Sequence, residues 1–312
     1  MQRETGPEAD SSRASTDDRV ARVTRGSSFA VLWAIANIIH IVIHSGGRIT
    51  DLTPGLNLAA AIFLLGRPSS SHRLALLAAA HLLDTAWMLP FAPDHQLLAA
   101  SVNAVILGAY AYRQLRRERS IDDVDHLVDV IAPAARWLLL VAYSFAAIAK
   151  YNIDYVDPIT SCGAFLAETA SYGLIDRDNA LSLFPLWGTL VIESLVPVFL
   201  VIPRTRRWGV LFGGAFHYVV SLSPAVSVGD FTFLLFALFF LFLPKDQGAE
   251  IGRRVVAWWR SLDSVPRYDR VPRWVFGIPF LLLVGAAGLG GVVILWVFTT
   301  VVGLWWLILT WQ

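Results

Sequence analysis

The sequence predicts an all-α fold, a polytopic membrane bundle of about nine transmembrane helices (eight to ten). Hydrophobic residues make up 56% of the 312 residues and charged residues only 16%, whereas soluble domains carry about 25% charged residues. The mean hydropathy is +0.57, and from Phe29 onward long apolar runs alternate with short polar loops. This composition excludes a disordered chain, a coiled coil and a nucleic-acid-binding protein.

The N-terminal residues differ from the rest of the chain. Residues 1–27 are rich in Ser, Asp and Arg, lack apolar periodicity and show no signal-cleavage site, so we predict a disordered cytoplasmic tail. Residues 28–243 contain eight apolar runs, and about 20 helical residues cross the hydrocarbon core of a bilayer. The predicted spans are 28–45, 52–66, 73–91, 96–112, 134–151, 183–203, 207–222 and 226–243.

The second span is short and contains Pro54 and Asn57, so hydropathy alone does not decide it. With all eight spans retained, 22 of the 25 Lys and Arg residues fall in alternate loops. Omitting the second span destroys this alternation. Since positive residues stay on the cytoplasmic side, we predict a cytoplasmic N-terminus and an acidic 152–182 loop on the outer side.

Two further segments follow the eighth span. Residues 244–273 combine Arg with Trp and predict a basic amphipathic helix on the inner leaflet. Residues 274–312 carry no charge and are too long for one upright helix. One tilted span gives nine in total, and a hairpin at the GAAGLGG stretch (285–291) gives ten.

Ionisable side chains inside spans are costly and by default mark function. The predicted topology puts most of them in the outer half of the bundle, which predicts one polar cavity that opens outward. They are His40, His44, His81, Asp84, Lys150, Glu193 and His217, with Asp94 and His95 in an outer turn. Structural roles remain open for each: hydrogen bonds between helices for the histidines and acids, and an ammonium group that reaches the outer interface for Lys150.

Lys150 is the strongest candidate of this set. Only Lys150 and Lys245 among the basic residues are lysines, and positive charge is otherwise kept from the outer side. A lysine in apolar surroundings, unlike an arginine, can lose its proton and act as a base.

The order of motifs around Lys150 resembles the vitamin K-dependent gamma-carboxylase family, whose membrane part is the horizontally transferred transmembrane domain. A span ends in AKYNIDY, then come an outer loop, VIESL, PRTRRWG, FGGAFHYVVSL and FTFLLFA. The similarity in order and spacing covers roughly residues 80–243, and residues 28–80 match in hydropathy only.

The resemblance implies an enzyme in which Lys150 deprotonates a reduced quinone and His95 is the second catalytic residue. It places His217, Glu193, Phe216 and Asp84 at the quinone, and no metal ligand is assigned. The implied cofactor is a reduced quinone of the menaquinol or vitamin K hydroquinone type, with O2 and CO2 as co-substrates. The quinone enters from the bilayer, and a small molecule or peptide reaches the extracytoplasmic site from water.

One departure from the family bears on the substrate. The eukaryotic carboxylase continues into a large extramembrane β-rich region that holds its protein substrate, whereas residues 244–312 are a basic linker and an apolar segment. Two other functions remain open. One is a metal-dependent membrane oxidoreductase, with ligands drawn from His40, His44, His81, Asp84 and His217, although no H-x-x-H-H cluster is present. The other is a proton-coupled transporter or channel, although the sequence contains no repeat.

Overall fold

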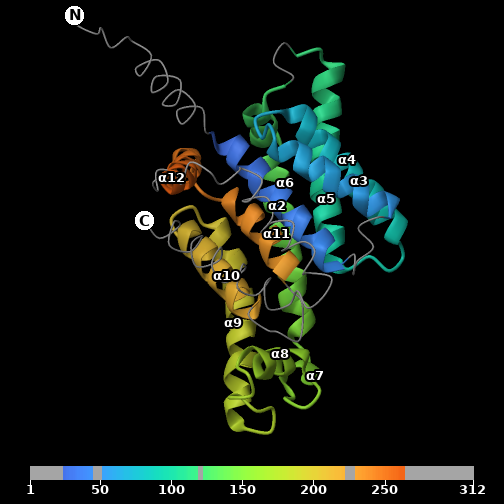
Figure 1. Cartoon of the computed structure of the whole chain (residues 1–312). Coiled ribbons are helices and arrows are strands. Elements are labelled where there is room, and N and C mark those ends of the chain that lie inside the picture. Colours follow the sequence, from blue (N-terminus) through green and yellow to red (C-terminus); the bar gives the residue numbers. More distant parts are fainter. Residues whose placement is uncertain (1–23, 45–50, 119–121, 222–228, 264–312) are drawn as a thin grey trace, which may run out of the picture.

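The computed structural model describes residues 24–44, 51–118, 122–221 and 229–263, and every regular element in these ranges is a helix (Figure 1). The predicted C-terminal segment 274–312 and residues 1–23 of the predicted tail lie outside the described residues. The elements are α2 (Arg25–His44), α3 (Leu52–Leu65), α4 (Ser71–Met88), α5 (Asp94–Leu115), α6 (Val124–Lys150), α7 (Ile153–Val156), α8 (Cys162–Ala170), η2 (Ala180–Ser182), α9 (Leu183–Val201), α10 (Arg206–Ser221), α11 (Gly229–Phe240) and α12 (Lys245–Asp263).

Each of the eight predicted spans coincides with one helix, and α12 lies within the predicted amphipathic linker. The largest difference is at α6, which begins ten residues before the predicted start at 134. The Asp123 side chain caps this helix by accepting hydrogen bonds from the N–H groups of Asp125 and His126 at 2.9 and 3.3 Å. The cap starts the helix ten residues earlier, in the segment VDHLVDVIAP, whose charged residues hide it from a hydropathy scan.

The segment that hydropathy left undecided, 52–66, forms α3 although it contains Pro54 and Asn57. Pro54 lies in the first turn, where the backbone N–H has no partner within the helix and its loss costs little. Asn57 is fully buried, and its Nδ2 donates to Asp84 Oδ2 at 3.3 Å. The polar residue that lowers the hydropathy of α3 therefore joins α3 to α4.

The 152–182 segment, expected as an outer loop, contains α7, α8 and η2. Each has a side-chain cap: Asn152 accepts from Tyr155 N, Ser161 from Gly163 N and Asn179 from Leu181 N. Such short helices carry no hydropathy or periodicity signal, because one or two turns are stabilised by caps and by contact with α9.

Three described helices are long and apolar enough to cross a membrane: Arg25–Ile43, Val124–Lys150 and Ala180–Val201. α3 and α11 are shorter apolar helices. On α6, Trp137, Val141, Phe145 and Ile148 form an exposed apolar stripe at helical spacing, with Trp137 and Phe145 about two-thirds exposed. A continuous stripe of this kind is typical of contact with lipid rather than water.

One end of the bundle is strongly basic. Arg25 and Arg136 both donate to the carbonyl oxygen of Leu241, at 2.5 Å from Arg25 Nη2 and 2.8 Å from Arg136 Nε. They border a cavity of about 380 Å³ whose other basic lining residues come from the α9–α10 turn, the start of α10 and the start of α12: Arg204, Arg206, Arg207 and Lys245. Basic residues from four segments that the charge pattern assigns to one side thus meet around one cavity.

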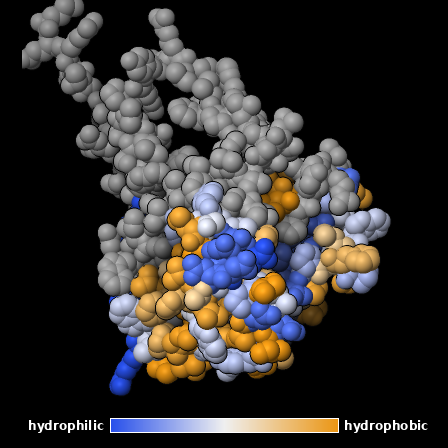
Figure 2. Space-filling model, turned by 90° about the horizontal axis from the view of Figure 1, so that it is seen from below, coloured by the Kyte–Doolittle hydropathy of each residue, from blue (hydrophilic) through white to orange (hydrophobic). Residues whose placement is uncertain are grey.

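The opposite end carries α7 and α8 (Figure 1). Viewed from that end, hydrophilic residues gather in the middle of the described surface, and hydrophobic residues lie around them (Figure 2). The two ends of the bundle therefore differ in chemistry, with excess positive charge at one end and a polar patch among apolar residues at the other.

α10 and α11 pack closely at Gly213, where the absence of a side chain leaves room for the Phe239 ring. A Cβ on buried Gly213 would collide with the Phe239 ring, so we expect Gly213→Ala to destabilise the bundle by about 1–3 kcal/mol through overpacking. Gly108→Ala on α5 is the matched control, because nothing lies within 4 Å of its Cβ position. The measurement is the thermal unfolding midpoint in detergent, and an equal midpoint for both variants would contradict the packing described here.

Candidate functional site

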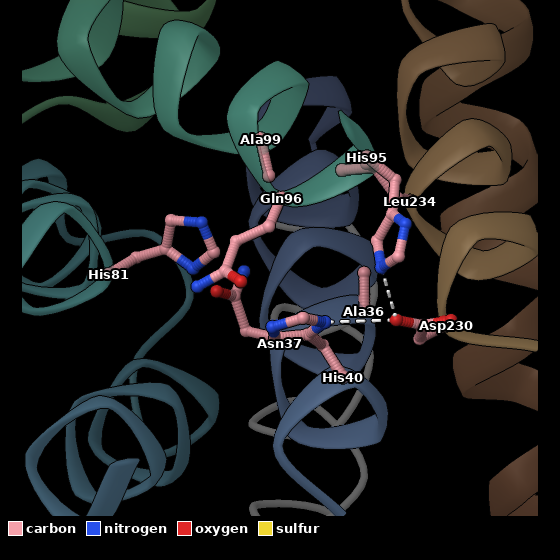
Figure 3. Close-up of a pocket in the computed structure, with 9 residues that line it drawn as sticks. All are labelled: Ala36, Asn37, His40, His81, His95, Gln96, Ala99, Asp230 and Leu234. Atoms are coloured by element: carbon pink, nitrogen blue, oxygen red, sulfur yellow. Dashed lines mark hydrogen bonds and ion pairs between the residues drawn. The ribbon is translucent and has the colours of Figure 1, made fainter. Parts of the chain in front are cut away.

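Two histidines and an aspartate from three helices meet inside the bundle (Figure 3). His40 Nδ1 lies 2.9 Å from Asp230 Oδ2, and His95 Nε2 lies 2.8 Å from the same oxygen. Asp230 and His40 are buried, at 2% and 7% exposure, and the His95 side chain is 21% exposed. One carboxylate oxygen thus lies within hydrogen-bond distance of two imidazoles. We call these three residues the histidine–aspartate cluster.

The local sequence explains how each member reaches this position. His40 lies one turn before the end of α2, whereas His95 and Asp230 are each the second residue of their helix. α2 and α11 run antiparallel, because Arg25 at the start of α2 contacts Leu241 just beyond α11 while His40 contacts Asp230. The cluster is therefore about 22 Å of helix away from the basic end.

Sequence analysis missed Asp230. It lies in the predicted span 226–243 but was not counted among the intramembrane acids. A signal was present, because Asp230 is the only charged residue of the otherwise apolar helix GDFTFLLFALFF. An acid in the first turn is also favoured by the helix dipole.

A small cavity adjoins the cluster and is lined in addition by Asn37, His81 and Gln96 (Figure 3). Its volume of about 10 Å³ is close to the space that one water molecule or ion requires. Asn37 Oδ1 and Gln96 Oε1 have no hydrogen-bond partner among the described residues, although these residues are only 3% and 1% exposed. Buried polar oxygens are normally hydrogen-bonded, so these two are available as acceptors to a small ligand in the cavity.

His81 and Asp84 lie beside the cluster, on α4. Asn57 connects them, with its Nδ2 at 3.4 Å from His81 Nδ1 and 3.3 Å from Asp84 Oδ2. The His81 ring centroid is 6.1 Å from that of His40. Asp84 is therefore held by α3 and is not among the residues that line the cavity, which argues for a positioning role.

Lys150 forms the second polar group. Its Nζ lies 2.6 Å from Glu193 Oε2 on α9 and 3.3 Å from the carbonyl oxygen of Ala146. The two side chains are 24% and 9% exposed. Lys150 thus pairs with a buried acid and is not extended into bulk solvent. We call Lys150 and Glu193 the lysine–glutamate pair.

Aromatic rings connect the two polar groups. The His217 ring contacts those of Tyr143 and Phe231, at centroid distances of 5.8 and 5.2 Å. Phe231 also contacts His95 at 5.8 Å. His217 is close enough to Lys150 for an electrostatic interaction between them. Phe231 therefore stands between the histidine–aspartate cluster and the residues around the lysine–glutamate pair.

Tyr155 of α7 lies beside the lysine–glutamate pair. Lys150 Nζ lies 5.9 Å from the centre of its ring. Burial, together with the negative charge of Glu193, raises the pKa of Tyr155 to about 12. Its hydroxyl group therefore stays protonated at neutral pH, and the ring contributes a neutral face toward the ammonium group.

The predicted site residues thus fall into two neighbouring groups rather than one shared cavity. Lys150 and Glu193 form one group, and His95 belongs to the other with His40. His217 lies between them, and Phe216 contacts it at a centroid distance of 5.0 Å. The side chain of His44 lies outside the described residues. Comparisons with family models, with curated proteins and with solved structures gave no match.

The lysine–glutamate pair predicts a non-additive stability effect. Removing one partner leaves the other charged in mostly apolar surroundings. The losses of unfolding free energy in Lys150→Met and in Glu193→Gln should therefore add up to more than the loss in the double variant. We expect a coupling energy of roughly 0.5–1 kcal/mol, at the low end of the usual range because Lys150 is partly exposed.

The control for this double-mutant cycle is the surface pair Arg253–Glu250 on α12. Exposed pairs couple weakly, so its cycle should be additive. Unfolding midpoints of the purified variants provide the measurement. Additive effects at Lys150 and Glu193 would mean that the two groups do not interact in the folded protein.

Proposed function

We propose that this protein is an integral membrane enzyme that oxidises a reduced quinone, with Lys150 as the base that accepts the quinol proton. The observation that carries the proposal is the lysine–glutamate pair, in which an amine is held 2.6 Å from a buried carboxylate at the end of a membrane-type helix. A pair of this kind keeps a proton available without leaving a net charge in apolar surroundings.

The surroundings of Lys150 fit a lipid quinone. Exposed apolar side chains follow the same helix up to the pair, including Phe145 at 69% and Ile148 at 66% exposure. Phe184 at the start of α9 is 75% exposed. An isoprenoid chain in the bilayer could lie along these side chains while the head group approaches Lys150. A reduced quinone supplies two electrons and two protons when bound.

The proton chemistry follows from the pair itself. With the shared proton on Lys150, the pair is an ammonium–carboxylate; with it on Glu193, the pair is an amine and a carboxylic acid. Both arrangements are neutral overall. In the second, the Lys150 amine is free to accept a proton, and the pair then holds two protons as an ammonium group and a carboxylic acid. The net positive charge gained at the pair stabilises the negative charge left on the deprotonated oxygen.

His217 and Tyr143 exclude water from the inner side of the pair, since both are buried and their rings are in contact. Water exclusion protects a strongly basic intermediate from being quenched. The resemblance to the gamma-carboxylases implies that O2 is the oxidant and that the second substrate loses an unactivated proton.

The same proposal includes a topology. We propose nine spans, a cytoplasmic N-terminus and an extracytoplasmic site, in the cell membrane. The meeting of basic residues from four segments around one cavity supports this orientation, because positive residues concentrate on the cytoplasmic side. The acidic residues of the 152–182 segment lie near the opposite end, which carries α7 and α8.

Lys150→Arg tests the base directly. Arginine keeps the positive charge but does not lose its proton in proteins. We expect the rate of menaquinol consumption in nanodiscs, started by O2 and corrected for autoxidation, to fall by about 10²–10⁴-fold, the usual contribution of a general base.

The matched control is Lys245→Arg, because Lys245 is the only other lysine and lies on the surface, paired with Asp129. It should turn over quinol like the unaltered protein. Full turnover by the Lys150→Arg variant would remove this residue from the mechanism. Absence of quinol oxidation by the unaltered protein would reject the proposed function itself.

Cys162 provides a test of topology without any substitution. It is the only cysteine, it is exposed and it begins α8. A membrane-impermeant maleimide should label it in intact cells. In the Cys162→Ser, Lys245→Cys double variant, labelling should require permeabilisation. The reverse pattern would invert the proposed orientation.

A further inference from the structure

We propose that His40, His95 and Asp230 bind a single divalent transition-metal ion. Imidazole nitrogen and carboxylate oxygen are the ligands that zinc and ferrous iron accept, and two histidines with one carboxylate make up a known three-ligand set with open positions. The proposal does not rest on the proposed quinone chemistry, since neither Lys150 nor Glu193 belongs to this site.

The distances fit a common ion. The three ligand atoms, one from each residue, all lie within 4.8 Å of one another. Two ligand atoms that are each about 2.0–2.1 Å from an ion lie about 2.9 Å apart at the right angles of an octahedral site and about 3.3 Å apart at the tetrahedral angles that zinc prefers, so the octahedral geometry of ferrous iron fits better. The separations from Asp230 Oδ2 to the two imidazole nitrogens are 2.9 and 2.8 Å. Three separate helices present these atoms, so a bound ion would tie α2, α5 and α11 together.

A hydrogen-bonded arrangement of the same residues would explain the short distances equally well, because one carboxylate can accept from two imidazoles. The cavity beside them favours the ion. Its volume of about 10 Å³ suits one small ligand, and Asn37 Oδ1 and Gln96 Oε1, both buried in its lining, have no hydrogen-bond donor among the described residues. Hydrogen bonds within the cluster leave these oxygens without a donor, whereas a water molecule on the ion would bring a donor into the cavity that they line.

The charge balance points the same way. Asp230 is 2% exposed, and the imidazoles of His40 and His95 lie 2.9 and 2.8 Å from its Oδ2. Positive charge close to a buried carboxylate stabilises it. A divalent ion held by neutral imidazoles supplies that charge and leaves coordination positions on the cavity side for water or a small oxygen-donor ligand.

Metal analysis of the purified full-length protein tests the site. We expect one equivalent of a transition metal, and after chelation we expect one equivalent of Co²⁺ to bind with an absorption spectrum typical of imidazole ligands. Asp230→Asn and His95→Gln should each weaken Co²⁺ binding by more than about 100-fold, since changes outside the ligand set alone cost about 10–100-fold. His126→Ala, at an exposed histidine of α6, should bind like the unaltered protein.

Co²⁺ should also raise the unfolding midpoint of the unaltered protein and of the His126→Ala variant but not that of Asp230→Asn. The decisive measurement needs no variant: unaltered protein that is isolated without metal and binds neither Co²⁺, Zn²⁺ nor Fe²⁺ after chelation would overturn the proposal. Binding that persists unchanged in Asp230→Asn would also overturn it, because the ion would then lie elsewhere. Quinol turnover is measured separately, so loss of Lys150 function and loss of metal can be told apart.

Discussion

The antiparallel packing of α2 against α11 is the constraint on which both ends of the molecule depend. It brings Arg25 to the carbonyl oxygen of Leu241 at one end and His40 to Asp230 at the other. In an apolar bundle every buried polar group needs a partner within the protein. These two contacts give a buried cation and a buried anion partners across the helix pair, and they fix the register between the two helices along their length.

The polar interior is organised in layers around this helix pair. The histidine–aspartate cluster is completed by α5, and α3 and α4 add Asn57, His81 and Asp84 behind it. On the other side, α6 and α9 hold the lysine–glutamate pair. Phe231 and His217 separate the two groups, with ring contacts to both sides. Two sites with different chemistry can thus lie close together without forming ion pairs with each other.

The separation has a consequence for the chemistry. The lysine–glutamate pair is partly open and borders the apolar surface that lipid would cover, whereas Asp230 and His40 are buried deep in the bundle. The first group is therefore accessible to the proposed lipid substrate, whereas the cavity of about 10 Å³ at the second admits only a small ligand. The proposed base, Lys150, is not one of the proposed metal ligands, so the two proposals can be tested independently.

The helices at the eight predicted spans were predictable because each is encoded by a local apolar run, although only three described helices are long and apolar enough to cross a membrane. The segment 52–66 is helical despite Pro54 and Asn57, and its place as a membrane span stays a prediction, since α3 is one of the shorter apolar helices. The polar start of α6 and the short helices α7 and α8 were not predictable, since caps and contacts with α9 stabilise them. The ninth span remains a prediction because residues 274–312 lie outside the described structure.

The candidate site was only partly predictable. Lys150, Glu193, His95 and His40 could be identified one by one, because an ionisable residue in an apolar run is conspicuous in any sequence. Their partners could not, since pairing joins residues far apart in the chain, such as His95 with Asp230. The sequence by itself determined that this chain forms apolar helices with costly polar residues inside them. Only the tertiary structure decided which of those residues meet, because the direction and register of helix packing depend on side chains from several helices at once.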